Sequence, residues 1–149
     1  MAERNHYFKI YISGALTDLS ENSDKKVFYE KIAEIADVIF GSGTAYVPHH
    51  FTDPKDHFYV APRKVYERDK EEVTSSNVVI AYIGTASLGV GAELEMANAK
   101  EIPILLLYEK GSKVSRLPRG MEMVKGICEF ESQEEALQWV EHELRKLQK

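Results

Sequence analysis

An almost uninterrupted apolar run, Asn77-Val78-Val79-Ile80-Ala81-Tyr82-Ile83, constrains the fold of this chain more than any other segment. A strand exposed on one face alternates polar and apolar residues, whereas a strand covered on both faces does not. Residues 102–107 repeat the pattern, and Pro103 stands near the start, where a strand tolerates proline. Two such runs predict a parallel sheet buried between two layers of helices.

Segments of strand and helix character alternate along the rest of the chain. The expected strands are residues 8–12, 45–47, 77–83, 102–107 and 126–130, and the expected helices are residues 23–38, 62–75, 90–100 and a last helix opening at Ser132. This alternation predicts an α/β fold of three layers, α/β/α, with a five-stranded parallel sheet and right-handed crossovers. We expect the strand order 2-1-3-4-5 of flavodoxin-like and Rossmann-like folds. No repeat or shift in composition divides residues 1–149, so one domain is expected.

The charge balance and hydropathy exclude some classes of partner. The chain has 149 residues with 19 basic and 24 acidic side chains, and its formal net charge is −5. Because the basic residues are scattered rather than gathered in a stripe, we expect no nucleic acid partner. No apolar run approaches the roughly 20 residues that span a bilayer, so no membrane partner is expected. The N-terminus lacks the apolar core of a secretory signal, which favours a cytoplasmic location.

The segment Ser87-Leu88-Gly89-Val90-Gly91-Ala92-Glu93 follows a buried strand and opens a helix, where anions bind well. Gly89 and Gly91 let backbone N–H groups approach an anion closely, and the Ser87 hydroxyl can add a hydrogen bond. These features predict a phosphate cradle. Glu93 is expected in the first turn of the helix, where the positive helix end favours its ionised form at neutral pH. A carboxylate held beside an anchored anionic ligand can act as a nucleophile.

A second acid is expected near Glu93. Asp69 recurs with Val65 and Val73 on one side of the helix at residues 62–75, where an apolar residue would be expected. That helix leads into the third strand, and ligands of such sheets bind beyond the carboxyl ends of the strands. Paired carboxylates carry out glycosidic chemistry and lie about 5 Å apart in retaining enzymes.

Simpler structural interpretations compete with these. Glu93 would then be a partner of the helix dipole, and Asp69 would form an ion pair with Arg63 or Arg68. Tyr11 alternates with two isoleucines, so its hydroxyl could reach the sheet edge on the opposite face. Its structural alternative is core packing with one satisfied hydroxyl.

A loop rich in histidine and aspartate follows the second strand and contains His49, His50, Asp53, Asp56 and His57. Their spacing matches no recognised ligand pattern, so no metal is expected. The loop is interpreted as a lid over the expected ligand crevice at the strand ends, with His49 nearest that crevice. The glycines form neither a Walker A loop nor a GxGxxG motif, so ATP and NAD are disfavoured and no cofactor is predicted. The single cysteine, Cys128, is expected to be a packed core thiol.

Three segments carry a resemblance to a known family: Tyr11-Ile12-Ser13-Gly14-Ala15, Asp69 before the apolar run at residues 77–81, and the run from Ser87 to Glu93. Together they resemble the nucleoside 2-deoxyribosyltransferase superfamily, and within it the 2'-deoxynucleoside 5'-monophosphate N-glycosidases. The resemblance covers most of the chain. It implies that Glu93 attacks C1' and forms a glycosyl-enzyme ester, that Asp69 assists protonation of the departing base, and that Tyr11 orients the Glu93 carboxylate.

The residue pattern and the resemblance together give a set of expected substrate-binding residues. These are Ser13, Gly14, Ala15, Thr17, His49, Ser87, Gly89, Gly91 and Ser115. The resemblance implies that Ser87, Gly89 and the backbone after the first strand hold a 5'-phosphate, and that Ser115 reaches that phosphate across a homodimer interface. The chain departs from the family pattern at Thr17, where the N-glycosidases carry a basic residue, and at Ala92, where they often carry an aromatic one.

Several functions are compatible with these residues. The serine and two glycines favour a phosphorylated substrate, and so a hydrolase that releases a free base and (deoxy)ribose 5-phosphate from a (2'-deoxy)nucleoside 5'-monophosphate. A transferase would share the first step but pass the sugar to a second base instead of water. The fold could also serve as a non-catalytic nucleotide-binding module, because fold alone does not establish chemistry. The remaining interpretation is an interaction protein with an acidic docking surface.

Overall fold

The computed structural model describes residues 7–15, 24–52 and 59–148. Within these ranges the strands are β1 (Ile10–Ser13), β2 (Ala45–Tyr46), β3 (Val78–Tyr82), β4 (Ile104–Glu109) and β5 (Val124–Phe130). The helices are α1 (Asp24–Phe40), α2 (His49–Thr52), α3 (Pro62–Thr74), α4 (Leu88–Ala99), α5 (Arg116–Arg119) and α6 (Gln133–Leu147). None of these described helices has the length and apolar character needed to cross a bilayer.

The strands form a parallel sheet in the order β2-β1-β3-β4-β5. The fold class and the strand order expected from the sequence are therefore confirmed. β1 lies between β2 and β3. In folds of this order the connections on the two sides of the first strand leave on opposite faces of the sheet, and ligands usually bind beyond the strand ends there. In this register Tyr11 pairs with Tyr46 on β2 and with Val79 on β3.

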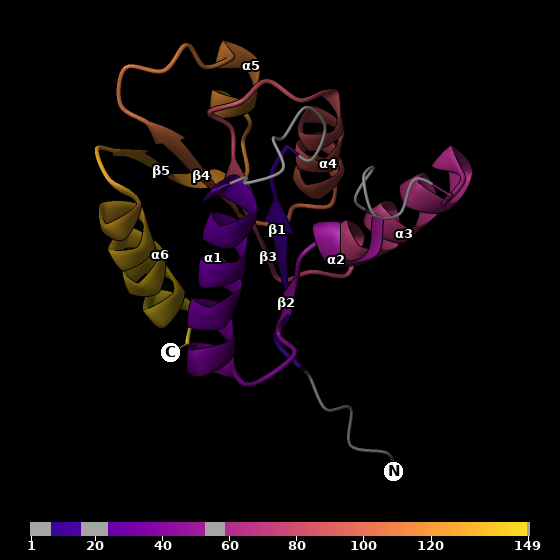
Figure 1. The fold of residues 1–149 in the computed structure, drawn as a ribbon, viewed down its shortest axis with the longest axis horizontal. Coiled ribbons are helices and arrows are strands. Elements are labelled where there is room, and N and C mark those ends of the chain that lie inside the picture. Colours follow the sequence, from indigo (N-terminus) through magenta and orange to yellow (C-terminus); the bar gives the residue numbers. More distant parts are fainter. Residues whose placement is uncertain (1–6, 16–23, 53–58, 149) are drawn as a thin grey trace.

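Two layers of helices cover the sheet. Figure 1 shows α1 and α6 side by side over one face, while α3 and α4 cover the other. Ile10 and Ile12 point into the core beneath α1 and α6, together with the buried and free Cys128. Tyr11 points into the core beneath α3 and α4, where it lies with Leu94. The predicted packed thiol is confirmed, and so is the prediction that Tyr11 faces away from the flanking isoleucines.

Two short helices lie where the sequence predicted loops. α2 follows β2 after two residues, and α5 interrupts the connection between β4 and β5. Each has four residues, which is too short to show the apolar periodicity that identifies a helix in a sequence.

Serine side chains cap the helices α4 and α6. Ser87 Oγ accepts a hydrogen bond from the Val90 N–H over 3.3 Å, and Ser132 Oγ accepts one from the Glu135 N–H over 3.1 Å. Such caps satisfy N–H groups that have no partner within the helix. The cap at Ser87 fixes where α4 begins relative to the end of β3.

Candidate active site

Glu93 lies on α4, close to the carboxyl end of β3. Because the helix begins at Leu88, Glu93 is its sixth residue and occupies the second turn. The expectation that Glu93 stands in the first turn is therefore wrong, since the Ser87 cap starts the helix earlier than the apolar pattern indicated. The field of a helix N-terminus fades beyond the first turn, so it stabilises the Glu93 carboxylate only weakly.

The Glu93 carboxyl is held by a neighbouring strand. Ser13, at the end of β1, is fully buried, and its Oγ donates a hydrogen bond to Glu93 Oε2 over 2.7 Å. Desolvation raises the pKa of Glu93 to about 7 even though the hydrogen bond from Ser13 lowers it. The negative charge of Asp69 raises this pKa further, and the Tyr11 hydroxyl lowers it. The helix end was expected to favour the ionised form at neutral pH, but the pKa is raised instead, because burial outweighs the groups that stabilise the carboxylate.

The Tyr11 hydroxyl is buried beneath α3 and α4. It has no hydrogen-bond partner of good geometry among the described residues. Desolvation strongly raises the pKa of Tyr11, and the charges of Glu93 and Asp69 raise it further. The hydroxyl is therefore protonated at physiological pH and can donate a hydrogen bond to a neighbouring carboxylate.

Asp69 lies on α3, four residues before the buried Val73. Its Oδ1 atom is buried and has no hydrogen-bond partner within the described residues. Desolvation raises the pKa of Asp69 to about 6, although the nearby Arg68 lowers it. Arg63 forms its ion pair with Glu67, so it is not the partner of Asp69 that the simpler structural interpretation offered.

Three elements therefore bring together Tyr11, Ser13, Asp69 and Glu93, which we call the carboxyl cluster. Their proximity is shown by the Ser13 hydrogen bond and by the effect of Asp69 on the pKa values of both Tyr11 and Glu93. Two carboxyls that titrate near neutrality are suited to different tasks, because one can be ionised while the other keeps its proton. The cluster can supply a nucleophile, a proton donor and a hydroxyl that orients one of them.

The predicted phosphate cradle at the start of α4 is partly used by the helix itself. Ser87 Oγ already accepts from the Val90 N–H, and the Ser87 carbonyl accepts from the Gly91 N–H over 3.2 Å. This leaves the N–H groups of Leu88 and Gly89 directed beyond the helix N-terminus. A Cβ built on Gly91 would meet no atom of the described residues within 4 Å, so none of these neighbours requires glycine there.

Gly14 and Ala15 follow β1 and lie against Tyr29 of α1. A Cβ at Gly14 would collide with the Tyr29 ring, so internal packing already requires glycine at this position. The Tyr29 hydroxyl donates to the carbonyl of the buried Ala15 over 3.4 Å. Thr17 lies outside the described residues.

His49 begins α2 and is buried, with its Nε2 atom 3.2 Å from Glu30 Oε1 on α1. His50 Nε2 lies at the same distance from the same oxygen. One ligand atom from each of these residues lies within 4.8 Å of the others, which would suit a metal ion, but two hydrogen bonds account for the same geometry. Burial lowers the pKa of His49, and its Nδ1 is buried without a hydrogen-bond partner among the described residues. Three further loop residues lie outside the described ranges: Asp53, Asp56 and His57.

A groove of about 1400 Å³ runs along α4, between this helix and residues 113–122. Ser87 and Ser115 both line it. Ser115 is exposed, and so are Leu88 and Leu117, which line the same groove. No member of the carboxyl cluster lines the groove, so it is a surface separate from the buried acids.

The sequence did not reveal two contacts of this site. Ser13 was expected to bind substrate, whereas the structure places its hydroxyl on Glu93. The signal was available, because residues two apart on a strand share a face, which puts Ser13 beside Tyr11. The contact of His49 with Glu30 had no such signal, since it depends on how α1 packs beside α2.

No protein-family model matches the chain. Two curated relatives carry the provisional name 2'-deoxynucleoside 5'-phosphate N-hydrolase 1. The protein from Methanosarcina barkeri is 30% identical over 87 residues, which are 56% of this chain and 55% of the relative. The protein from Syntrophotalea carbinolica is 37% identical over 49 residues, which are 33% of this chain and 34% of the relative. The matches thus span about half and about a third of the relatives' lengths.

Solved structures match over most of the chain. A CMP N-glycosidase from Clostridium botulinum superposes with a TM-score of 0.61 at 17% identity, covering 91% of this chain and 98% of that chain. A 2-deoxyribosyltransferase from Bacillus psychrosaccharolyticus gives a TM-score of 0.64 at 18% identity, covering 87% and 90%. At these identities the likeness shows the fold. The predicted resemblance is thereby confirmed: the chain has the fold of the nucleoside 2-deoxyribosyltransferase superfamily and shares sequence with proteins named as nucleotide N-hydrolases.

Proposed function

We propose that this chain hydrolyses the N-glycosidic bond of a (2'-deoxy)nucleoside 5'-monophosphate to a free base and (deoxy)ribose 5-phosphate. The observation that carries the proposal is the carboxyl cluster, in which two acids with raised pKa values lie beside a buried tyrosine hydroxyl. The names of the two curated relatives support a nucleotide substrate. The chain is related to nucleotide N-hydrolases and deoxyribosyltransferases, and the finer assignment rests on the cluster.

In the first step the ionised Glu93 carboxylate attacks C1' of the sugar. The bond between C1' and the base nitrogen breaks, its electron pair goes to the base, and Asp69 supplies the proton that the departing base needs. The raised pKa of Asp69 suits this task, because a carboxyl titrating at about 6 keeps its proton where an ordinary aspartate has lost it. The product is an ester between Glu93 and C1'.

In the second step water resolves this ester. Asp69, now ionised, accepts a proton from the water molecule while the water oxygen attacks C1'. The bond between C1' and the Glu93 oxygen breaks, which restores the carboxylate and releases the sugar 5-phosphate. No cofactor or metal is needed for either step.

Two hydroxyls prepare Glu93 for attack. The hydrogen bond from Ser13 fixes one carboxyl oxygen and stabilises the ionised form. The Tyr11 hydroxyl, which remains protonated, orients the same carboxyl from the side of β1. Together they offset part of the cost of a buried negative charge.

The substrate phosphate would be bound at the N-terminus of α4. The N–H groups of Leu88 and Gly89 and the Ser87 hydroxyl would contact the phosphate, with help from the backbone after β1. We also propose a homodimer in which a second copy covers the groove along α4 and Ser115 reaches the phosphate of its partner. The exposed Leu88 and Leu117 on this groove favour an interface there, because exposed apolar patches mark interaction sites.

A single experiment separates the candidate reactions. The chain is incubated with a panel of ribo- and deoxyribonucleotides and nucleosides, each with and without a free acceptor base, and the products are separated by chromatography. The hydrolase releases free base and sugar 5-phosphate without an acceptor. Base exchange only when an acceptor is present would identify a transferase, and binding without any base release would identify a non-catalytic nucleotide-binding module.

A further inference from the structure

Tyr46 on β2 forms a stacked pair with Tyr11. The two residues are register partners on adjacent strands, so their side chains lie on the same face of the sheet. Their ring centroids are 5.5 Å apart and their planes differ by 19°. Both residues are buried in the core beneath α3 and α4. The Tyr46 ring therefore packs against the face of the Tyr11 ring.

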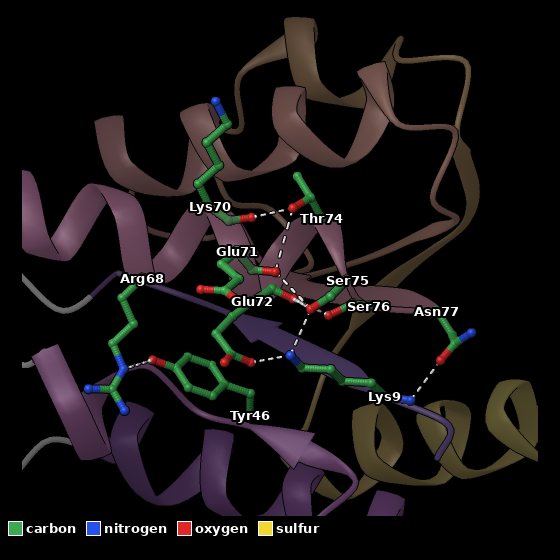
Figure 2. A network of polar contacts seen from close by, with 10 residues as sticks. All are labelled: Lys9, Tyr46, Arg68, Lys70, Glu71, Glu72, Thr74, Ser75, Ser76 and Asn77. Atoms are coloured by element: carbon green, nitrogen blue, oxygen red, sulfur yellow. Dashed lines mark hydrogen bonds and ion pairs between the residues drawn. The ribbon is translucent and has the colours of Figure 1, made fainter. Parts of the chain in front are cut away.

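Arg68 anchors the far end of Tyr46. Its Nε donates a hydrogen bond to the Tyr46 hydroxyl over 3.1 Å, as Figure 2 shows. Burial raises the pKa of Tyr46 to about 12, and the charge of Asp69 raises it too, whereas Arg68 lowers it. The Tyr46 hydroxyl thus lies within the electrostatic reach of two adjacent residues of α3, one of which belongs to the carboxyl cluster.

The C-terminal end of α3 is itself tied to the sheet. Lys9, just before β1, forms an ion pair with Glu72 and donates a hydrogen bond to Ser75 Oγ over 2.7 Å (Figure 2). The Lys9 N–H donates to Asn77 Oδ1 over 2.8 Å. These contacts fix α3 relative to β1, and Arg68 therefore approaches the β1–β2 pair from a helix of defined position.

The Tyr11 hydroxyl depends on this packing for its direction. It has no hydrogen-bond partner of good geometry among the described residues, so the placement of its ring decides where it points. A neighbour packed flat on the ring removes the freedom to swing about the side-chain torsions. A displacement on the order of 1 Å can cost about 100-fold in rate in an organised site.

We propose that Tyr46 and Arg68 are positioning residues that keep the Tyr11 hydroxyl aimed at the Glu93 carboxyl. The kinetic consequences rest on the proposed function, whereas the geometry rests on the stacked rings and on the Arg68 hydrogen bond. Neither residue touches the reacting atoms. Tyr46 acts through the Tyr11 ring, and Arg68 acts through Tyr46.

A double-variant cycle tests this dependence. Tyr46→Leu removes the ring that stacks on Tyr11 and should lower kcat about tenfold while KM changes less than about twofold. In a Tyr11→Phe background the same change should lower kcat no further, because the hydroxyl that Tyr46 positions is already gone. Equal losses in both backgrounds would mean that Tyr46 only supports the fold, and that result would overturn the proposal.

Conservative variants and a matched control accompany the cycle. Tyr46→Phe keeps the stacked ring but loses the Arg68 hydrogen bond, so its kcat should lie between those of the wild type and Tyr46→Leu. Arg68→Gln should show the same loss as Tyr46→Phe, with no additional loss in the double variant. The control is Phe8→Leu, because Phe8 stacks on Phe40 with ring centroids 4.1 Å apart, next to the other end of β1. It should lower the melting temperature without lowering kcat. If Tyr46→Leu fails to fold, Tyr46→Phe and Arg68→Gln carry the same test through smaller changes.

The titration of the Glu93 carboxyl, followed by carbon NMR, tests the positioning without catalysis. Ser13, Tyr11 and Asp69 face this carboxyl, and the Tyr11 hydroxyl lowers its pKa. Tyr46→Leu should therefore raise the pKa of Glu93 as much as Tyr11→Phe does, and the double variant should raise it no further.

This pattern of pKa changes in a chain that cleaves no nucleotide would reject the proposed function and keep the positioning role. An active chain whose kcat and Glu93 pKa are unchanged by Tyr46→Leu would reject the positioning role alone.

Discussion

Ser13 Oγ donates a hydrogen bond to Glu93 Oε2 over 2.7 Å and so joins the end of β1 to the second turn of α4. The two residues are 80 positions apart in the chain. This contact lowers the pKa of Glu93, whereas burial raises it to about 7. The proposed nucleophile is therefore ionised in part at neutral pH, which makes its activity sensitive to small changes around it.

The first prediction concerns the pH dependence of kcat/KM. The active form needs Glu93 ionised and Asp69 protonated, and it is the less populated of the two singly protonated forms because Glu93 has the higher pKa. Activity should therefore fall as pH drops below about 6 and fall again as pH rises above about 7. The profile should be a narrow bell with its maximum between these values, and its two apparent pKa values belong to the coupled pair. Ser13→Ala removes a hydrogen bond to the charged form, so the limb that reports Glu93 should move to higher pH by about one unit.

The control for this shift is Ser76→Ala. Ser76 is also buried, but its hydroxyl donates to a backbone carbonyl, that of Glu72, within α3. Its loss should leave the pH profile unchanged. An unshifted profile in Ser13→Ala would contradict the role assigned to the contact.

The second prediction concerns the phosphate. Ser87→Ala should raise the Kd of monophosphates about tenfold and that of nucleosides much less, as measured by calorimetry. It should also lower the free energy of unfolding by about 1 kcal/mol through loss of the helix cap. Ser132→Ala removes the equivalent cap of α6 and should cost similar stability without changing either affinity. Equal losses for monophosphates and nucleosides would remove the argument for a phosphate cradle.

The third prediction links Glu93 to stability. Its pKa in the folded chain, about 7, exceeds the ordinary value of 4.5, so the folded state binds more protons than the unfolded state between these limits. The stability cost of Glu93 therefore grows as pH rises from 4.5 to about 7 and is complete above that. Glu93→Gln should be near neutral at about pH 4.5 and stabilise the chain by on the order of 2 kcal/mol at about pH 8, measured by urea unfolding.

The exposed Glu67 provides the comparison. Its hydrogen bond from Arg63 lowers its pKa, which is the opposite direction from Glu93. Glu67→Gln should therefore bring no gain in stability at high pH. If the free energy of unfolding of Glu93→Gln equals that of the wild type at every pH, burial of the Glu93 carboxylate does not destabilise the folded chain.

The fourth prediction concerns the homodimer. If Ser115 serves the phosphate of the partner, then Glu93→Gln chains mixed with Ser115→Ala chains should form heterodimers with one intact site. The mixture should cleave monophosphates faster than the sum of the separate variants, up to about half of the wild-type rate per heterodimer. Ser112→Ala, at a serine in the same connection that does not line the groove, is the control partner. Additive rates in the mixture would place Ser115 outside the partner's site.

The sequence predicted the fold because apolar periodicity records which face of each element is buried. The same periodicity placed Tyr11 opposite Ile10 and Ile12 and identified Asp69 as a polar residue on the inner side of its helix, and both placements are confirmed. These features depend on local spacing, which a sequence displays directly.

The ionisation of Glu93 could not be predicted in the same way. It depends on desolvation by segments far apart in the chain and on the exact residue at which α4 begins. The use of the Gly91 N–H within the helix and the packing of Tyr29 against Gly14 likewise arise only when distant elements meet. A sequence gives the residue types of such a site but not the solvent exposure that sets their chemistry.

If Glu93 forms an ester with C1', a reacting sample that is quenched in acid should retain the adduct, which mass spectrometry can map. A (deoxy)ribose 5-phosphate adduct is expected on the peptide that contains residue 93. Glu93→Gln should bind nucleotide but form no adduct and release no base. Base release by Glu93→Gln at the wild-type rate, or an adduct on a different residue, would rule out Glu93 as the nucleophile.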